Sequence, residues 1–363
     1  MNAKERMKIA MQGGMPDRVP VSPQICPPHA IRVAGLPFEE TIVDILRHPR
    51  RYDLLVGQCA KNYGVDTVRV WIAQEPKTIK WEGKQAYEID LSTGEYVGVV
   101  DFMGGGGVLQ MESRRHKLTD KNIDAIQVSP VEELLQSETL TPAIRAVKEF
   151  GKEMFIIGVP GVFTVETLMF SEGMEMALID LIERPDFIKR LTERKMEASI
   201  QEAIALARAG VDALYIGETF GGFMSPKQFA NLCLPYFQQF VDEVRPYGPL
   251  IYLHMCGKIT HLLELIVETG VDCIEPLDVV GGTPVEEVKR RIGDRIALMG
   301  GVNTVLLSRG SLEEVRNDCV RCLREAAAGG GYILAACDML PTETSPEKVL
   351  SMLECANTLG RYS

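Results

Sequence analysis

The chain has 363 residues, of which 46% are hydrophobic and 25% are charged, a composition typical of a globular protein with a large core. Its formal net charge of −11 at pH 7 argues against nucleic acid or an anionic membrane surface as a partner. The charged start has no apolar signal region, and no stretch reaches about 18 consecutive apolar residues, so we expect a cytoplasmic protein. Nine cysteines, an odd number, fit a reducing compartment better than a disulfide framework.

The first part of the chain predicts helices around two strands. Residues 16–23 are a turn that leads into a first strand, and the β-branched run 66–72 is a second. Helices are expected at 3–12, at 38–47 and from Pro49 to about residue 60, because apolar residues recur there at helical spacing.

Residues 76–117 show a different pattern, that of an antiparallel insertion. Three short strand-like runs are separated by Glu82-Gly83-Lys84 and Ser92-Thr93-Gly94, which have the composition of hairpin turns. The run Gly104–Gly107 lacks the following Lys-Ser/Thr of a phosphate-binding loop, so we interpret it as a flexible flap.

From residue 155 onward, strand-like runs alternate with helical ones. Six strands are predicted, at 155–161, 213–218, 250–257, 273–278, 296–303 and 332–338. Helices are predicted at 174–182, 185–209, 226–244 (interrupted at Pro235), 259–269, 284–291 and 312–328. Eight strands mostly separated by helices predict an α/β fold, a (β/α)₈ TIM barrel in one domain spanning 1–363, with the hairpin insertion after strand two.

The run Leu250–Lys258 carries the strongest functional signal. It is an apolar strand that ends at Gly257, and side chains on a strand alternate with period two, so His254 and Cys256 share one face. An imidazole and a thiolate are good ligands for Zn²⁺, but a catalytic zinc site needs a third protein ligand.

The third ligand is sought at the other carboxyl ends of the strands, where the catalytic groups of such barrels gather. Cys337 follows the eighth strand and Glu218 follows the fourth. His254, Cys256 and Cys337 would leave a fourth position for water, substrate or the Glu218 carboxylate. Each residue alone also fits a core or hydrogen-bonding role, but all of them fall at strand ends of one face.

Other candidate residues are assigned with less functional weight. Cys319 and Cys322 form a C-x-x-C pair inside a helix without a second ligand pair, so core filling is the better interpretation. Residues near the predicted mouth that could contact a substrate are His29, Tyr215, Phe220, Phe223, Met224, Phe163, Asp278 and Asn303. The apolar side chains among them could equally pack within the barrel and its loops, and Asp278 and Asn303 could equally cap a loop.

Four motifs extend the signal over nearly the whole chain. They are Pro16-Asp17-Arg18-Val19-Pro20, Ser225-Pro226-Lys227-Gln228-Phe229, His254-Met255-Cys256-Gly257, and Gly330-Gly331-Tyr332 followed by Cys337. With them the chain resembles the uroporphyrinogen decarboxylase superfamily, and within it most closely the zinc- and corrinoid-dependent methyltransferases. The arginine-bearing Gln-Ala-Gly-Arg segment of the decarboxylases is absent, and the segment 22–29 stands in its place.

The resemblance implies zinc held by His254, Cys256 and Cys337, and methyl transfer between a small substrate and the cobalt of a corrinoid (cobalamin) on a separate protein. Zinc would act as a Lewis acid on a methyl donor such as an aromatic methyl ether, or would bind an acceptor thiol as thiolate. We favour the first direction, O-demethylation. Glu218 would be a displaceable ligand or a proton carrier.

Two hypotheses that assign other classes of function remain open. One is a metal-free decarboxylase or lyase on the same barrel, and the other is a non-catalytic barrel that binds zinc or a ligand. The sequence names neither the methyl donor nor the acceptor nor the corrinoid partner. It also leaves the oligomeric state open, a homo-oligomer included.

Overall fold

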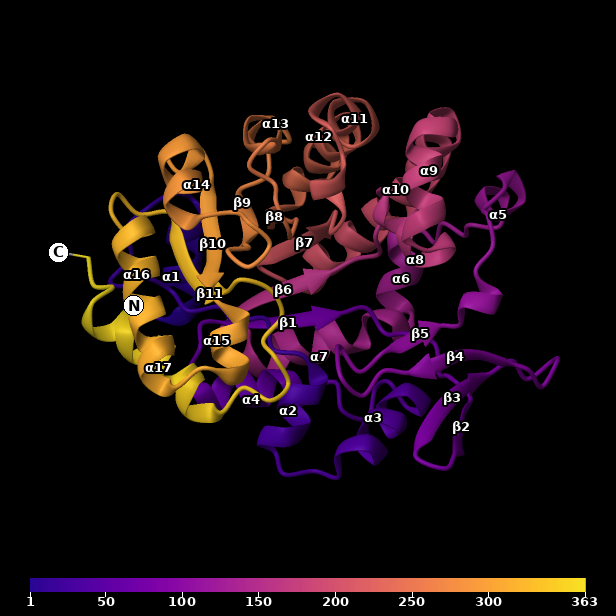
Figure 1. The fold of residues 1–363 in the computed structure, drawn as a ribbon, viewed down its shortest axis with the longest axis horizontal. Coiled ribbons are helices and arrows are strands. Elements are labelled where there is room, and N and C mark those ends of the chain that lie inside the picture. The colour runs from indigo at the N-terminus through magenta and orange to yellow at the C-terminus, as the bar shows by residue number, and fades with distance from the viewer. Residues whose placement is uncertain (363) are drawn as a thin grey trace.

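A computed structural model describes residues 1–362 of the chain. Seven parallel strands curl around a common axis in the order β1-β6-β7-β8-β9-β10-β11, with helices outside them (Figure 1). The strands are β1 Thr67–Trp71, β6 Phe155–Val159, β7 Ala213–Gly217, β8 Leu250–His254, β9 Cys273–Leu277, β10 Ala297–Val302 and β11 Tyr332–Ala336. The fold is TIM-barrel-like, as the alternation of strands and helices predicts.

The predicted first strand is present only as an irregular segment. Val21 forms an isolated parallel bridge with Leu334 of β11, and its carbonyl oxygen accepts the backbone N–H of Asp66 at 2.9 Å, just before β1. The segment therefore lies between β11 and β1 and fills the eighth position of the ring. Pro20 and Pro23 have no N–H to donate, so a regular ladder cannot form there.

The helices surround this ring and close its amino-terminal end. Their bounds are α1 Ala3–Met11, α2 Pro27–Val33, α3 Phe38–Arg47, α4 Leu55–Tyr63, α5 Asp120–Asp124, α6 Val131–Gln136, α7 Thr141–Phe150, α8 Glu166–Glu172, α9 Met174–Glu183, α10 Pro185–Ala209, α11 Pro226–Leu232, α12 Leu234–Val244, α13 Leu263–Glu268, α14 Val285–Ile292, α15 Thr304–Arg309, α16 Leu312–Ala326 and α17 Pro346–Thr358. Short 3₁₀ turns are η1 Glu112–Arg114, η2 Glu138–Leu140, η3 Gly221–Phe223 and η4 Arg245–Tyr247. Within residues 1–362, no helix combines the length and the apolar character needed to cross a membrane.

Helix α1 is the floor of the barrel. Its buried Met7, Ala10 and Met11 join one cluster with the inward side chains of the strands, among them Phe155 and Tyr252. A second and larger cluster fills the space between the strands and the outer helices. Side chains that face the barrel axis therefore pack in the first cluster, and side chains that face the helices pack in the second, as the period-two alternation predicts.

The predicted antiparallel insertion is confirmed and has one strand more than expected. It is a sheet in the order β2 Ile79–Glu82, β3 Gln85–Ile89, β4 Tyr96–Val100 and β5 Val108–Gln110. The glycine run is the β4–β5 turn: the Asp101 carboxylate accepts the N–H groups of Met103 and Gly104, each at 2.9 Å. Gly106 has φ +77°, and a Cβ there would lie 3.0 Å from Pro28, so the turn packs against α2.

Candidate active site at the mouth of the barrel

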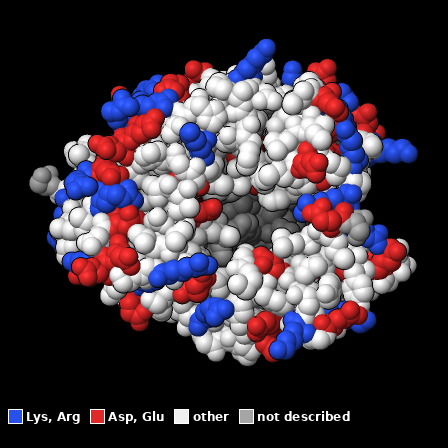
Figure 2. Space-filling model, viewed as in Figure 1, with Lys and Arg blue, Asp and Glu red and all other residues white. Residues whose placement is uncertain are grey.

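The inward face of the strands changes from apolar to polar toward their carboxyl ends. On β8 the buried Tyr252 belongs to the floor cluster, and His254 is the next inward residue. On β9 the corresponding residues are Cys273 and Glu275. On the face shown in Figure 2, the molecule is hollowed near its centre, and the rim of the hollow is mostly uncharged, with a few Asp, Glu, Lys and Arg side chains.

His254 is held by a buried chain of charges. Its Nδ1 lies 2.6 Å from Oε2 of Glu275, and Oε1 of Glu275 lies 3.6 Å from Nη2 of Arg69 on β1. Burial would lower the pKa of His254, but the Glu275 carboxylate and the Cys256 thiol raise that pKa to about 10. Burial would raise the pKa of Glu275, but His254 and Arg69 hold it below its usual value. Because Nδ1 is engaged, Nε2 is the imidazole nitrogen left for a ligand or a metal.

Cys256 lies just beyond the end of β8, beside His254. Its Sγ is 3.6 Å from the carbonyl oxygen of Thr219, which follows β7, and the residue is half-buried. The next residue, Gly257, has φ +79° and donates its N–H to Oδ2 of Asp278 at 2.8 Å. The predicted substrate contact Asp278 thus fixes the loop that carries Cys256, and it also accepts the N–H of Gly281.

Cys337 follows β11 at the same end of the barrel. Its buried Sγ accepts the backbone N–H of Thr304 at 3.4 Å and lies 3.6 Å from the hydroxyl of that residue. Among residues 1–362, no three or more His, Cys, Asp and Glu side chains are placed so as to hold a metal ion together. The donor chemistry of His254, Cys256 and Cys337 fits zinc, and so does the carboxylate behind His254. In the described residues, the Sγ of Cys337 has its hydrogen-bond contacts with Thr304.

The side chain of Glu218 is directed away from these three residues, although its backbone N–H donates to the carbonyl oxygen of His254 at 2.9 Å. Tyr215 and Gly217 occupy the inward positions of β7, and Glu218 faces the helix layer, where its Oε2 is 3.8 Å from Sγ of Cys233. Burial, together with the nearby Glu166 carboxylate, raises the pKa of Glu218 to about 8. The prediction that Glu218 reaches the metal is not supported by this placement, because period-two alternation turns it away from the mouth.

The remaining predicted substrate contacts separate into two groups. Tyr215 faces the mouth, with its ring centroid 5.2 Å from that of His254. Phe220, just before η3, and Phe223, within it, form an aromatic pair with ring centroids 6.5 Å apart. The others are engaged by neighbouring residues of the fold. Phe163 stacks on Phe240, and Met224 is buried against Cys233. Nε2 of His29 is hydrogen-bonded to the hydroxyl of Tyr63 at 2.9 Å, and Asn303 caps α15 by accepting the N–H groups of Val305 and Leu306. For Asn303, the capping alternative is the observed one.

Four charged residues at the mouth were not predicted: Arg69, Glu166, Glu275, and Asp338, which interacts electrostatically with His254 and Glu275. Arg69 and Glu275 each lie in a buried strand without another charged residue, a signal that is visible in the sequence. Glu166 at the start of α8 is buried, and its Oε2 accepts the N–H of Thr219 at 3.0 Å. Burial raises the pKa of Glu166. No local pattern distinguishes this residue from an ordinary first-turn glutamate.

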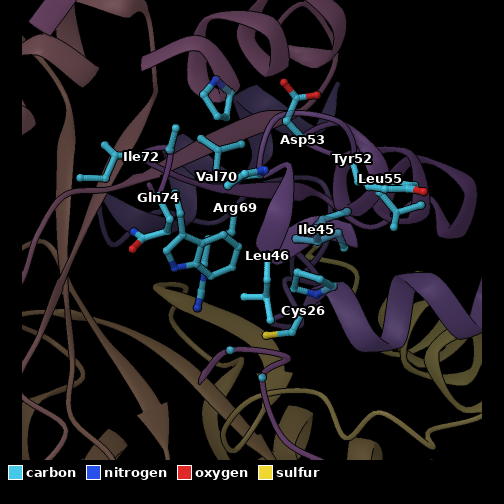
Figure 3. A pocket seen from close by; sticks show the side chains of 18 of the residues that line it. Cys26, Ile45, Leu46, Tyr52, Asp53, Leu55, Arg69, Val70, Ile72 and Gln74 are labelled. Carbon is cyan, nitrogen blue, oxygen red and sulfur yellow. The ribbon is translucent and has the colours of Figure 1, made fainter. Parts of the chain in front are cut away.

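A cavity of about 620 Å³ opens beside the mouth, between the end of β1, the α3–α4 connection and the glycine turn of the insertion (Figure 3). Arg69 lies at its inner end, and most of its wall is apolar. The apolar residues include Ile45, Leu46, Tyr52 and Trp71. A concave, mainly apolar site with a few polar groups is the form that small-molecule sites take.

The class that fold and site define is a TIM-barrel protein whose polar residues gather at the carboxyl ends of the strands. The sequence profile of the uroporphyrinogen decarboxylase (URO-D) family matches residues 109–359, and the chain belongs to this family. Uroporphyrinogen decarboxylase of Coxiella burnetii (strain RSA 493 / Nine Mile phase I) is 27% identical over 251 residues, which is 66% of this chain and 67% of that protein.

Two further comparisons cover more of the chain. Uroporphyrinogen decarboxylase of Legionella pneumophila (strain Lens) is 25% identical over 343 residues, 89% of this chain and 94% of that one. Among solved structures, a methyltransferase from Methanosarcina mazei superimposes with a TM-score of 0.71 at 19% identity, over 99% of both chains. At this identity the structural likeness supports the fold alone.

Proposed function

We propose that this chain is a methyltransferase whose site holds zinc through His254, Cys256 and Cys337, and which exchanges a methyl group with a corrinoid on a partner protein. The observation that supports it most is the His254–Glu275 pair beside Cys256. A carboxylate that fixes one imidazole nitrogen and leaves the other toward a neighbouring thiol is the usual setting of a metal-binding histidine. When bound, zinc supplies Lewis acidity to a methyl donor or stabilises an acceptor thiolate.

The residues of the chain have separable roles in this proposal. Glu275 holds the tautomer of His254, and Arg69 balances the second oxygen of that carboxylate. Asp278 positions the loop that presents Cys256. Tyr215, Phe220 and Phe223 offer an aromatic surface at the mouth against a substrate, which favours a methylated aromatic donor over a small polar acceptor.

Decarboxylation of a porphyrinogen, the activity in the names of the curated relatives, is the second candidate. A tetrapyrrole with many carboxylates needs several cationic partners. The cations that line the cavity, Arg69 and Lys77, already face Glu275 at 3.6 Å and Glu88 at 2.9 Å. In the described residues, Nε and Nη1 of Arg69 have no hydrogen-bond partner, and this one side chain could bind one substrate carboxylate at most. We therefore rank decarboxylation below methyl transfer.

The test is zinc content and methyl transfer measured on the same preparations. We expect about one zinc per chain in the wild type, and loss of zinc in His254→Ala, Cys256→Ala and Cys337→Ala. Cys319→Ala is the matched control, because Cys319 is a buried cysteine of α16 that should not affect the metal. Methyl transfer from aromatic methyl ethers to a corrinoid protein should follow zinc content. Wild-type protein that stays folded and metal-free in the presence of Zn²⁺ would contradict the proposal, and turnover of uroporphyrinogen would replace it.

A further inference from the structure

We infer that the 620 Å³ cavity beside the mouth is a binding site for a small carboxylic acid with an apolar or aromatic body, and that Arg69 receives the carboxylate. The inference rests on the cavity and on Arg69. It does not depend on zinc or on a corrinoid, so it stands or fails separately from the proposed function.

Arg69 is a buried cation with unused hydrogen-bonding capacity. Among the described residues, its Nε and Nη1 have no hydrogen-bond partner, although they are shielded from solvent. Its Nη2 is 3.6 Å from Glu275, which is an ion-pair distance and not a hydrogen bond. Unpaired buried donors cost free energy, most of all on a charged group, so a ligand acceptor at this position would be bound strongly.

The surroundings of Arg69 select the shape of the ligand. The ring centroids of Tyr215 and Tyr252 lie 5.4 and 5.6 Å from its guanidinium carbon, so both aromatic rings border the guanidinium. A carboxylate accepts charge-assisted hydrogen bonds from a guanidinium, and these are stronger than hydrogen bonds between neutral groups.

The other charges of the cavity limit the ligand to a single negative charge. Glu275 already faces Arg69, and Asp53 lines the outer part, where it pairs with Arg145 at 2.8 Å. Of the two cations that line the cavity, Lys77 is already bonded to Glu88, so a dianion such as a phosphate would meet these carboxylates with Arg69 alone to offset its charge. The apolar wall, with Leu46 and Trp71, accommodates the body of the molecule (Figure 3). A substituted benzoate has this combination of properties.

The experiment is calorimetric titration of the full chain, dialysed against EDTA, with 4-methoxybenzoate and with its neutral amide. We expect the acid to bind at least about tenfold more tightly than the amide, because only the acid pairs with Arg69. Arg69→Met should remove this preference by weakening the acid and leaving the amide unchanged. Lys77→Met is the matched control: Lys77 is the other cation on the wall, is bonded to Glu88, and should leave the preference intact.

A second variant covers the case in which Arg69→Met does not fold. Leu46→Trp enlarges a side chain of the cavity wall while Arg69 is retained, and it should weaken acid and amide alike. Equal affinity of the wild type for the two compounds, absence of saturable binding to the folded wild type, an acid preference that survives Arg69→Met, or affinities for both compounds that Leu46→Trp leaves unchanged would each overturn the inference.

Discussion

The floor and the mouth of the barrel are built by the same strands and differ by one inward position. On β8 the step from Tyr252 to His254, and on β9 the step from Cys273 to Glu275, leads from the apolar cluster closed by α1 to a buried chain of charges. The floor excludes water and specifies the ring. At the mouth, buried titratable groups lower the free energy of unfolding, because a buried charge is tolerated only when it is paired.

The largest effect is expected from breaking the charge chain at the mouth. Glu275→Gln keeps the side-chain volume but leaves Arg69 without a counter-charge, and removal of one member of a buried pair typically costs about 3–5 kcal/mol. Since the pKa of Glu275 is lowered by folding, its contribution is present above its unperturbed value of 4.5 and is lost as pH falls below it. Urea unfolding at pH 7 measures this cost, and an unchanged free energy of unfolding would show that Arg69 has another partner.

The floor should respond through volume and not through charge. Met11→Ala removes a buried side chain from the cluster beneath the ring and should cost about 2–5 kcal/mol, the usual range for such a cavity. The loss should be nearly independent of pH, in contrast to Glu275→Gln. Unfolding of both variants at pH 5 and pH 8 makes the comparison, and a strong pH dependence for Met11→Ala would contradict the division between floor and mouth.

Glu218 is the counterpart of Glu275: its carboxyl group faces outward and lacks the cations that Glu275 has. A variant at Glu218 therefore tests whether this difference in surroundings decides the protonation state. Folding raises its pKa from 4.5 to about 8, so the native state binds a proton that the unfolded chain has lost, and stability falls as pH rises through this window. Glu218→Gln mimics the protonated form. It should stabilise the protein by about 2 kcal/mol at pH 8, with the gain shrinking toward pH 5. Thermal unfolding across this range measures it, and destabilisation by the variant at pH 8 would indicate that the ionised form has a native partner.

The smallest effect is expected at Asn303, a polar residue near the mouth with a structural role. Asn303→Ala removes the side-chain acceptor for the first N–H groups of α15 and should cost about 1 kcal/mol. Asn303→Ser can retain the cap and should recover most of this loss. Zinc content and methyl transfer should be unchanged in both variants. A loss of activity without a loss of stability would return Asn303 to the substrate contacts.

The sequence by itself determined the seven regular strands of the ring, most helices and the inward phase of His254, because hydrophobic periodicity and side-chain alternation are local properties. On β7 the same alternation places Glu218 in the outward phase, whereas Tyr215 and Gly217 are inward. The β4–β5 hairpin was under-predicted because a three-residue strand has too few residues to show a period.

Only the tertiary structure decided which charges meet. Arg69, Glu275 and His254 come from three different strands, and nothing local indicates that one carboxylate faces both cations. The position of Cys337 against Thr304, and the cavity between β1, the α3–α4 connection and the insertion, depend likewise on how distant segments close the ring. Contacts between segments far apart in the chain are set by tertiary packing, which the hydrophobic periodicity of a single segment does not specify.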